Sequence, residues 1–516
     1  MIMLKQFLLK RRRAGQGSLR PEIPRNYGAR RVRRRRREQE SARHFQLPSL
    51  WGIVLVAMCS CSREPLRGSM VLSQTPAKPV QAHAPADILD LRYPAGTRVV
   101  LAGPDFKHFE ALSKGFYAAG DPQVSCDGKC VVFSGKLRAS DDWQIYEVKP
   151  GAGSWRAITS IRGGAMSPAL LPHDQVVFVS PVTKLSVSNT SRALYVIRAG
   201  EPSRQLSFTP SDLSEPTVLS DGRILFVEHR RCAETPAADR YALLTINNDG
   251  TEVTQFSALP DPTQPLHGPR ELADGRIAFV VPGPSEKSAI HIISAARPYA
   301  APEVPALPFK MVSSFSASPE GGLFLCAEPV SGLAAGKHAT ALYVTRGPGL
   351  EPGPPLMSDP DWNTIEAVGK SARVPPMGRL SNVDPSEKTG LILCLNANFT
   401  RNKMAKGTRI RVLAQVELDE VRSLGDVPLQ PDGSFMAEVP AEVPLGFELL
   451  DEHAKTVLRL APSIWVRPGE NRSCIGCHEP PNQSPRNFRP LAVSVPAPNL
   501  RPANRTLAQA KGAPHA

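Results

Sequence analysis

One short segment near the C-terminus carries residue types from which a redox cofactor site could be built. Residues 474–478 read Cys-Ile-Gly-Cys-His, so two thiols are separated by two residues and an imidazole follows directly. Thiols at this spacing can form thioether bonds to the two vinyl groups of a haem, and the next histidine can coordinate the iron. We therefore predict one covalent c-type haem on Cys474 and Cys477, with His478 as proximal iron ligand. Gly476 is expected to leave room for the macrocycle.

Three other interpretations of these residues remain open. A structural zinc site would need four ligands, and the other closely spaced cysteines, Cys126 and Cys130, are far away in sequence. A thioredoxin-like redox pair would need a βαβ context, whereas this region is rich in proline and in β-forming residues. A simple disulfide between Cys474 and Cys477 would leave His478 without a role.

The second axial ligand of such an iron is not specified by the sequence. The candidates are His229, His267, His453, Met311, Met357 and Met377. An open sixth position would instead suit a haem enzyme, and binding of CO to the reduced protein would distinguish it from a six-coordinate electron carrier.

Segment 1–61 has the residue order of an export signal. A basic region is followed by a short apolar run at 50–58, which is well below the roughly 20 residues of a membrane-spanning helix. Small residues and two cysteines come next, as in a signal peptide whose processing site is a lipidated cysteine. This order predicts a periplasmic or cell-envelope location, with Cys59 or Cys61 as the lipid anchor. The alternative is a basic tail followed by a buried apolar segment.

The positive charge of the chain is concentrated at its N-terminus. The formal net charge is +14, of which +12 belongs to residues 1–43. The remainder is close to neutral, so we predict no basic groove and no nucleic-acid partner. The expected partner is a redox protein of unknown identity, and the membrane is expected to be contacted only through the N-terminal anchor.

The region that must position the motif begins with repeated β-strand patterns. Residues 62–95 are rich in Pro, Ala and Ser and predict a disordered tether. Between 96 and 345 a turn with Asp-Gly or a relative precedes a short apolar strand five times, at spacings of 45 to 53 residues. This period is typical of propeller blades, whose small sheets bury their faces against one another. The alternative is an all-β sandwich with similar turns.

The C-terminal part is expected to form a second, smaller domain. Residues 346–385 are rich in Pro and Gly and predict a linker or an arm that crosses the propeller. Alternating strand patterns return at 386–470 and predict a smaller β domain. Residues 471–516 follow as the haem-attachment segment and a Pro-rich tail.

Two stretches resemble known families. "SCDGKCVVF" at 125–133, followed by "QIY" at 144–146, resembles the blade repeat of TolB-like six-bladed β-propellers. "VDPSEKTGLILCLNAN" at 383–398, "LGDVPLQPDGSFMAEVPAEVPLGFELLDE" at 424–452 and "IWVRPGENRSCIGCHEPPNQSP" at 464–485 resemble the middle domain of the hydrazine synthase α-subunit family. The second resemblance implies a c-type haem at Cys474, Cys477 and His478, and export to the periplasm.

The chain departs from this family in the number of its haem motifs. The family's α-subunit has two c-type haems, one of them catalytic, whereas this sequence contains one C-x-x-C-H. Hydrazine synthesis itself is therefore not expected. We predict an all-β protein, a six-bladed TolB-like β-propeller followed by a smaller β domain with a C-terminal c-type haem segment, that transfers electrons. The alternatives are a propeller binding module with a structural Cys/His site and a haem-dependent oxidoreductase.

Overall fold

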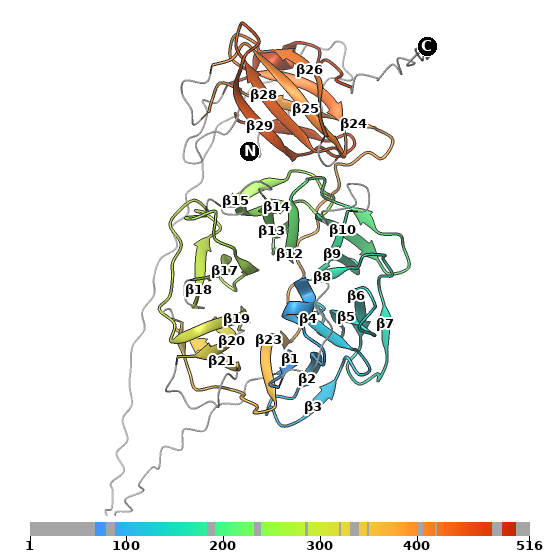
Figure 1. Ribbon diagram of the computed structural model, residues 1–516, viewed down its shortest axis with the longest axis vertical. Helices are drawn as coiled ribbons and strands as arrows, with labels where there is room; N and C mark the ends of the chain where they lie inside the picture. Colours follow the sequence, from blue (N-terminus) through green and yellow to red (C-terminus); the bar gives the residue numbers. More distant parts are fainter. Residues whose placement is uncertain are drawn as a thin grey trace, which may run out of the picture. The chain divides into compact units, whose positions relative to one another are not determined.

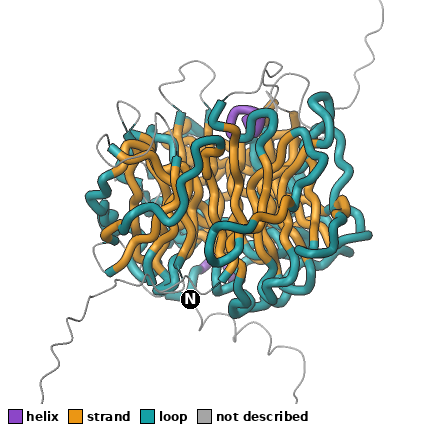
Figure 2. The backbone as a smooth tube through the Cα atoms, turned by 90° about the horizontal axis from the view of Figure 1, so that it is seen from below, coloured by secondary structure: helices purple, strands orange, loops and turns teal. Residues whose placement is uncertain are grey.

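The computed structural model of the protein describes residues 68–78, 88–182, 191–231, 239–257, 259–283, 287–318, 321–330, 340–347, 350–400, 406–417, 420–476 and 488–501. The predicted export segment, with Cys59 and Cys61, lies outside these ranges, and so do Cys477 and His478. Within the ranges nearly all regular structure is strand (Figure 2), and no helix is both long and apolar enough to cross a bilayer. The described part of the chain is therefore all-β, as the sequence predicts.

Six small antiparallel sheets are arranged around a central axis as the blades of a propeller (Figure 1). The first blade contains β4 (Ala118–Val124), β5 (Val131–Lys136), β6 (Gln144–Val148) and β7 (Trp155–Ala157). The second contains β8 (Met166–Leu171), β9 (Gln175–Pro181), β10 (Arg192–Arg198) and β11 (Arg204–Gln205). The third contains β12 (Asp212–Val218), β13 (Ile224–Arg230), β14 (Arg240–Ile246) and β15 (Thr254–Ser257). The fourth contains β16 (His267–Glu271), β17 (Arg276–Pro282) and β18 (Ser288–Ser294). The fifth contains β19 (Phe309–Ala317), β20 (Leu323–Pro329), β21 (Ala341–Arg346) and β22 (Glu351–Pro352). The innermost strands of neighbouring blades contact one another in a closed ring.

The sixth blade closes the ring with strands from both ends of the propeller sequence. It contains β23 (Trp362–Lys370), β1 (Ser69–Pro76), β2 (Arg98–Ala102) and β3 (Phe109–Ala111) in that order. β1 falls in the predicted tether 62–95 and β23 in the predicted linker 346–385, so the propeller extends beyond the predicted range 96–345 at both ends. The two strands pair antiparallel along their whole length. Each strand provides hydrogen-bond partners for the backbone N–H and C=O groups of the other, which explains why both are strands despite their Pro-rich surroundings.

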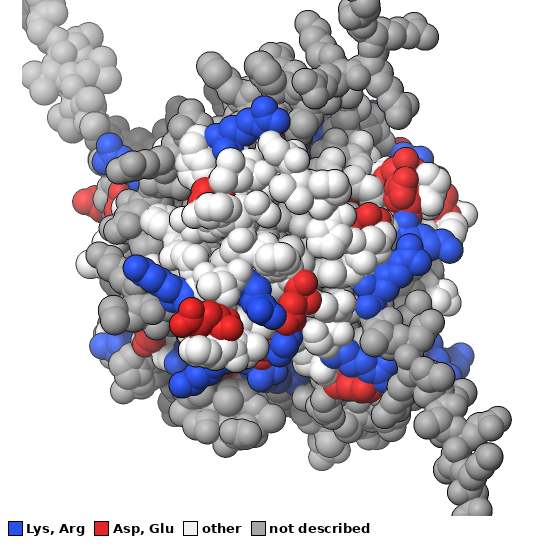
Figure 3. Space-filling view, turned by 90° about the horizontal axis from the view of Figure 1, so that it is seen from above, with Lys and Arg blue, Asp and Glu red and all other residues white. Residues whose placement is uncertain are grey.

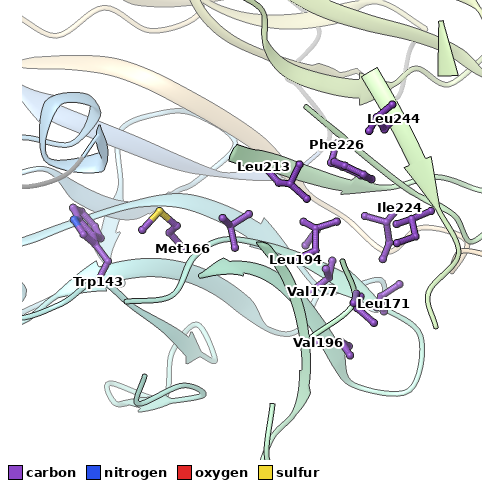
Figure 4. Packing of buried hydrophobic residues seen from close by; sticks show 14 of the residues in the cluster. Trp143, Met166, Leu171, Val177, Leu194, Val196, Leu213, Ile224, Phe226 and Leu244 are labelled. Atoms are coloured by element: carbon purple, nitrogen blue, oxygen red, sulfur yellow. The ribbon is translucent and has the colours of Figure 1, made fainter. Parts of the chain in front are cut away.

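The Asp-Gly turns join the first two strands of successive blades, as predicted. Their glycines adopt positive φ: 73° at Gly128, 83° at Gly222 and 79° at Gly275. Apolar side chains from neighbouring blades pack together between the sheets, and Figure 4 shows Met166, Leu194 and Phe226 in one such cluster. This side-by-side packing is how small sheets bury both faces without a separate core.

The chain leaves the propeller through an arm at residues 371–385. Backbone hydrogen bonds join Arg373 N to Cys126 O (2.8 Å) and Met377 N to Ser220 O (2.9 Å). The arm therefore lies along the turns of two blades.

The described residues of the C-terminal domain form seven strands. One sheet contains β27 (Phe435–Pro440), β24 (Thr389–Cys394) and β30 (Asn471–Cys474), and the other contains β26 (Glu420–Pro428), β25 (Arg409–Glu417), β28 (Leu445–Leu450) and β29 (Thr456–Ile464). Apolar residues of both sheets share one core cluster, so the domain is a β-sandwich. It extends beyond the predicted boundary at residue 470, because β30 belongs to its smaller sheet.

Both signs of charge occur together on the face drawn in Figure 3. Lys and Arg side chains lie near Asp and Glu there, and the described residues between them are largely uncharged. The described part of this face therefore mixes both signs of charge and does not form a large area of a single sign.

Candidate functional site

Cys474 is the last residue of β30, at the edge of the smaller sheet of the sandwich. β30 pairs in parallel with β24, and the register sets Cys474 opposite Cys394. Cys394 is fully buried, whereas Cys474 is partly buried and packs against the same core cluster. The first thiol of the motif is therefore held on a strand at the rim of the core, where its position is fixed more firmly than on a loop.

The glycine of the motif is required by the protein backbone. Leu395 N donates to Cys474 O (2.9 Å) and Asn396 N to Ile475 O (3.2 Å), which holds the motif against the loop after β24. A Cβ at Gly476 would lie 2.2 Å from Phe399 O, closer than side-chain carbons approach. The close approach of this loop is by itself enough to require a glycine at this position.

The segment before the motif is fastened to the propeller. Four hydrogen bonds do this: Trp465 Nε1 to Gly250 O (3.0 Å), Arg467 Nη1 to Gln205 O (3.1 Å), Glu252 N to Glu470 Oε1 (2.8 Å), and Arg472 Nη2 to Val253 O. Burial raises the pKa of Glu470, although the N–H groups of Glu252 and Arg467 favour its ionised form. The strand with Cys474 is therefore attached both to the sandwich and to a blade.

The described surroundings of the motif fit a haem. Two nitrogens of the Arg472 guanidinium, Nε and Nη1, are buried without a hydrogen-bond partner, and haem propionates are suitable acceptors for such donors. Apolar side chains flank segment 477–487, since Ile475 is 37% exposed and Phe488 36% exposed. A thiol, apolar neighbours and a guanidinium with free donors are groups that could hold a c-type haem, and the imidazole of His478 lies outside the described residues.

The candidate second axial ligands lie in different environments. His453 is on the β28–β29 turn with its side chain 81% exposed, as expected for a solvated histidine. His229 stacks on Tyr241 and shares a hydrogen bond of 2.8 Å with Asp239. Met357 is buried in the core of the propeller, whereas Met311 and Met377 are exposed.

A second polar site, which the sequence analysis did not predict, lies at the propeller axis. The buried carboxylate of Glu366, on β23, accepts hydrogen bonds from Ser73 Oγ (2.6 Å), Tyr93 OH (2.6 Å), Arg92 Nη2 (3.0 Å) and Asp121 N (2.8 Å). Arg92 ends helix α1 (Ile88–Arg92), which lies in the predicted tether, and also pairs with Glu215 at 2.9 Å. The adjoining cavity has a volume of about 30 Å³, which suits little more than one water molecule. This site therefore stabilises the ring and has little space for a ligand.

Burial and the groups around Glu215 shift the pKa of its carboxyl group in opposite directions. Burial alone would raise the pKa of Glu215, but Arg92, His267 and the N–H of Gly268 outweigh it and hold that pKa below its usual value. His267, one of the candidate iron ligands, interacts with this carboxylate, and partial desolvation lowers its pKa although the residue is exposed.

A repeated sequence pattern marks this axis and could have been used to predict where the innermost strands are interrupted. The innermost strands of four consecutive blades each contain a left-handed residue directly before a proline: Asp121 (φ 58°), Ser167 (φ 53°), Glu215 (φ 51°) and Gly268 (φ 57°). The strand register is interrupted at each of these positions. Such bulges redirect backbone N–H groups out of the ladder, and those of Asp121 and Gly268 donate to Glu366 and Glu215.

Asp121→Asn is expected to stabilise the protein at neutral pH. Burial raises the pKa of Asp121 to about 6, with Glu366 and Glu215 raising it and Arg92 and Arg270 lowering it. Because the folded-state pKa exceeds the unfolded value, the wild type loses stability as pH rises from about 4 through about 6. Asparagine tolerates a left-handed backbone as aspartate does. The variant should be more stable by about 1–3 kcal/mol at pH 7 and equal to the wild type near pH 4 in urea unfolding.

The matched control for this prediction is Asp127→Asn. The hydroxyl of Ser125 and the N–H of Lys129 lower the pKa of the exposed Asp127 to about 2, so its removal should give no gain at pH 7. A stability difference at Asp121 that is independent of pH would contradict the assignment.

Comparisons with known proteins agree with this architecture. Residues 385–479 match the family described as the hydrazine synthase alpha subunit middle domain. Among solved structures, the Kuenenia stuttgartiensis hydrazine synthase is similar with a TM-score of 0.72 and 15% identity, over 83% of this chain and 71% of that chain. TolB from Acinetobacter baumannii is similar with a TM-score of 0.43 and 14% identity, over 59% and 66%. A search of curated proteins gives no match. At 15% identity the likeness to the hydrazine synthase structure is one of fold, and it agrees with the predicted all-β propeller and smaller β domain.

Proposed function

We propose that this protein, whose residues 385–479 match the hydrazine synthase α-subunit middle-domain family, carries one covalent c-type haem and transfers electrons. The observation that carries the proposal is the C-x-x-C-H motif that begins on the last strand of that domain. Cys474 and Cys477 would hold the haem through thioether bonds, and His478 would coordinate the iron.

When bound, the haem supplies an iron that alternates between two oxidation states and so accepts and donates single electrons. The residues of the chain control its position and surroundings. β30 fixes Cys474 against the sandwich, and the contacts of Glu470 and Arg472 with the propeller limit movement of the segment before it. The buried charge of Arg472 favours binding of anionic haem propionates.

The proposed location is the periplasm or cell envelope. The basic region, short apolar run and cysteines of segment 1–61 support export, with Cys59 or Cys61 as a lipid anchor. Covalent haem attachment and export belong together in this proposal, because c-type haems are attached after translocation. The partner would be a redox protein that docks near the motif.

Expression of the full chain in a host that matures c-type cytochromes tests the proposal. We expect a haem stain that survives denaturing electrophoresis, and a mature mass that exceeds the polypeptide mass by one haem. The double variant Cys474→Ser, Cys477→Ser should lose this covalent haem completely. Cys126→Ser, which removes a partly buried thiol from a propeller turn, should retain it.

A bare polypeptide mass for the mature wild type would overturn the proposal. One zinc per chain in metal analysis would instead support a structural Cys/His site beside a binding propeller. A spectrum of the reduced protein that shifts with CO would indicate an open iron position and a haem-dependent oxidoreductase.

A further inference from the structure

A pocket of about 550 Å³ lies where the propeller, the arm and the sandwich meet. The residues that line it are Arg204 of β11, Ser381, Val383 and Pro385 of the arm, Glu387 and Lys388 before β24, Ala441 and Glu442 after β27, and Arg467 and Pro468 after β29. Its volume is within the range of small-molecule sites, which commonly form between domains. It is built from elements far apart in sequence and does not include the haem motif.

The base of this pocket contains a buried guanidinium, that of Arg467, which interacts with the carboxylates of Glu442, Asp249 and Glu470 and has one nitrogen without a hydrogen-bond partner. The side chain of Arg467 is 3% exposed, and its Nη1 pairs with Glu442 Oε1 at 2.9 Å. Its Nε is buried with no hydrogen-bond partner, and Glu442 itself is 43% exposed. Arg192 shows the contrasting case, since its Nε and Nη2 both donate to the buried Asp212, at 2.8 and 2.7 Å.

The rest of the lining adds further positive charge. Arg204 and Lys388 are exposed. Of the two carboxylates among the described lining residues, Glu442 pairs with Arg467, which leaves Glu387 beside these two cations. The charged groups of the lining sum to +1, with Arg467 at the base and Arg204 and Lys388 nearer solvent. Asp249 and Glu470, which do not line the pocket, also act on Arg467, so the excess of positive charge is on the solvent side. Because the base is largely desolvated, an anion there would interact more strongly with Arg467 than it would at an open surface.

We propose that this pocket binds a small anion with a carboxylate or phosphate group, which Arg467 attracts at the base and Arg204 and Lys388 contact near solvent. The guanidinium groups offer paired donors that match the oxygens of either group. The proposal is independent of the haem, because none of its residues belongs to the motif.

Isothermal titration calorimetry of the full chain with inorganic phosphate and, separately, with succinate tests this proposal at low ionic strength. We expect saturable binding of at least one anion, weakened by about tenfold or more in Arg204→Ala and in Lys388→Ala, since hydrogen bonds to charged groups contribute about that much. Both side chains are exposed, so the variants should fold. Lys129→Ala removes an exposed lysine from a distant propeller turn and should bind as the wild type does.

The two anions identify the group that is recognised. Binding of phosphate alone points to a phosphate ligand, and binding of succinate alone to a carboxylate. Arg467→Lys, if its thermal unfolding matches the wild type, should also weaken binding, because lysine lacks the planar pair of donors. No saturable binding of either anion, or equal binding by Lys388→Ala and Lys129→Ala, would overturn the proposal.

Discussion

Replacement of Trp465 by alanine is expected to lower the free energy of unfolding by about 3–5 kcal/mol, the range for a fully buried aromatic side chain. Trp465 is 1% exposed, and it belongs to the core cluster that is otherwise built from propeller residues. Its ring lies 6.5 Å from that of Phe208, and its Nε1 donates to Gly250 O at 3.0 Å. The alanine variant would lose this packing and leave a backbone carbonyl without its partner. Urea unfolding followed by circular dichroism measures the loss.

Two further variants separate the contributions of packing and hydrogen bonding. Trp465→Phe keeps most of the apolar volume and removes the N–H, so it should cost about 1–2 kcal/mol. Trp155→Ala is the matched control, since Trp155 lies on an outer strand and is 38% exposed. If Trp465→Ala destabilises no more than Trp155→Ala, the tryptophan does not join the sandwich to the propeller.

The repeated blades could be predicted because their signal is local. Each Asp-Gly turn and the strand after it lie within a dozen residues, and the recurrence of the unit indicates radial packing without knowledge of any contact. The strands of the smaller β domain were predictable for a similar reason, since they alternate in burial, as in β27, but their arrangement as a sandwich was not predicted. The motif at 474–478 was also readable, because the chemistry of its side chains depends on adjacent positions.

The closing strands could not be predicted because each depends on a distant partner. β1 lies beside a Pro- and Ala-rich stretch, and β23 lies between Pro- and Gly-rich stretches, so local composition indicated a tether and a linker. What makes them strands is their pairing with each other, across nearly three hundred residues, as between Ser73 and Glu366. Composition does not report non-local pairing. The hydrogen bonds of Glu366 to Ser73, Tyr93 and Asp121 are non-local in the same way, although the residues before proline in four blades mark the axis locally.

Removal of the Glu366 carboxylate is expected to have the other large effect on stability. This group is the shared acceptor for donors from β1, helix α1 and β4, and it lies on the strand that closes the ring. Glu366→Ala would leave Tyr93 and Ser73 without their partner and would remove one of the two carboxylates paired with Arg92. Loss of one member of a buried charged network commonly costs about 3–5 kcal/mol. The midpoint of urea unfolding at pH 7 should fall accordingly.

A smaller effect in Glu366→Gln would show that geometry and charge contribute separately. Glutamine keeps the shape and one acceptor oxygen, but its NH₂ group faces donors and its side chain is neutral, so we expect a loss of about 1–3 kcal/mol. Glu351→Ala, on the exposed outer strand β22, is the control and should change stability by less than about 0.5 kcal/mol.

In a double-mutant cycle, Ser73→Ala and Glu366→Ala should show coupling, because they remove one shared hydrogen bond. Additive losses, with Glu366→Ala no worse than the control, would mean that the ring closes through backbone pairing alone.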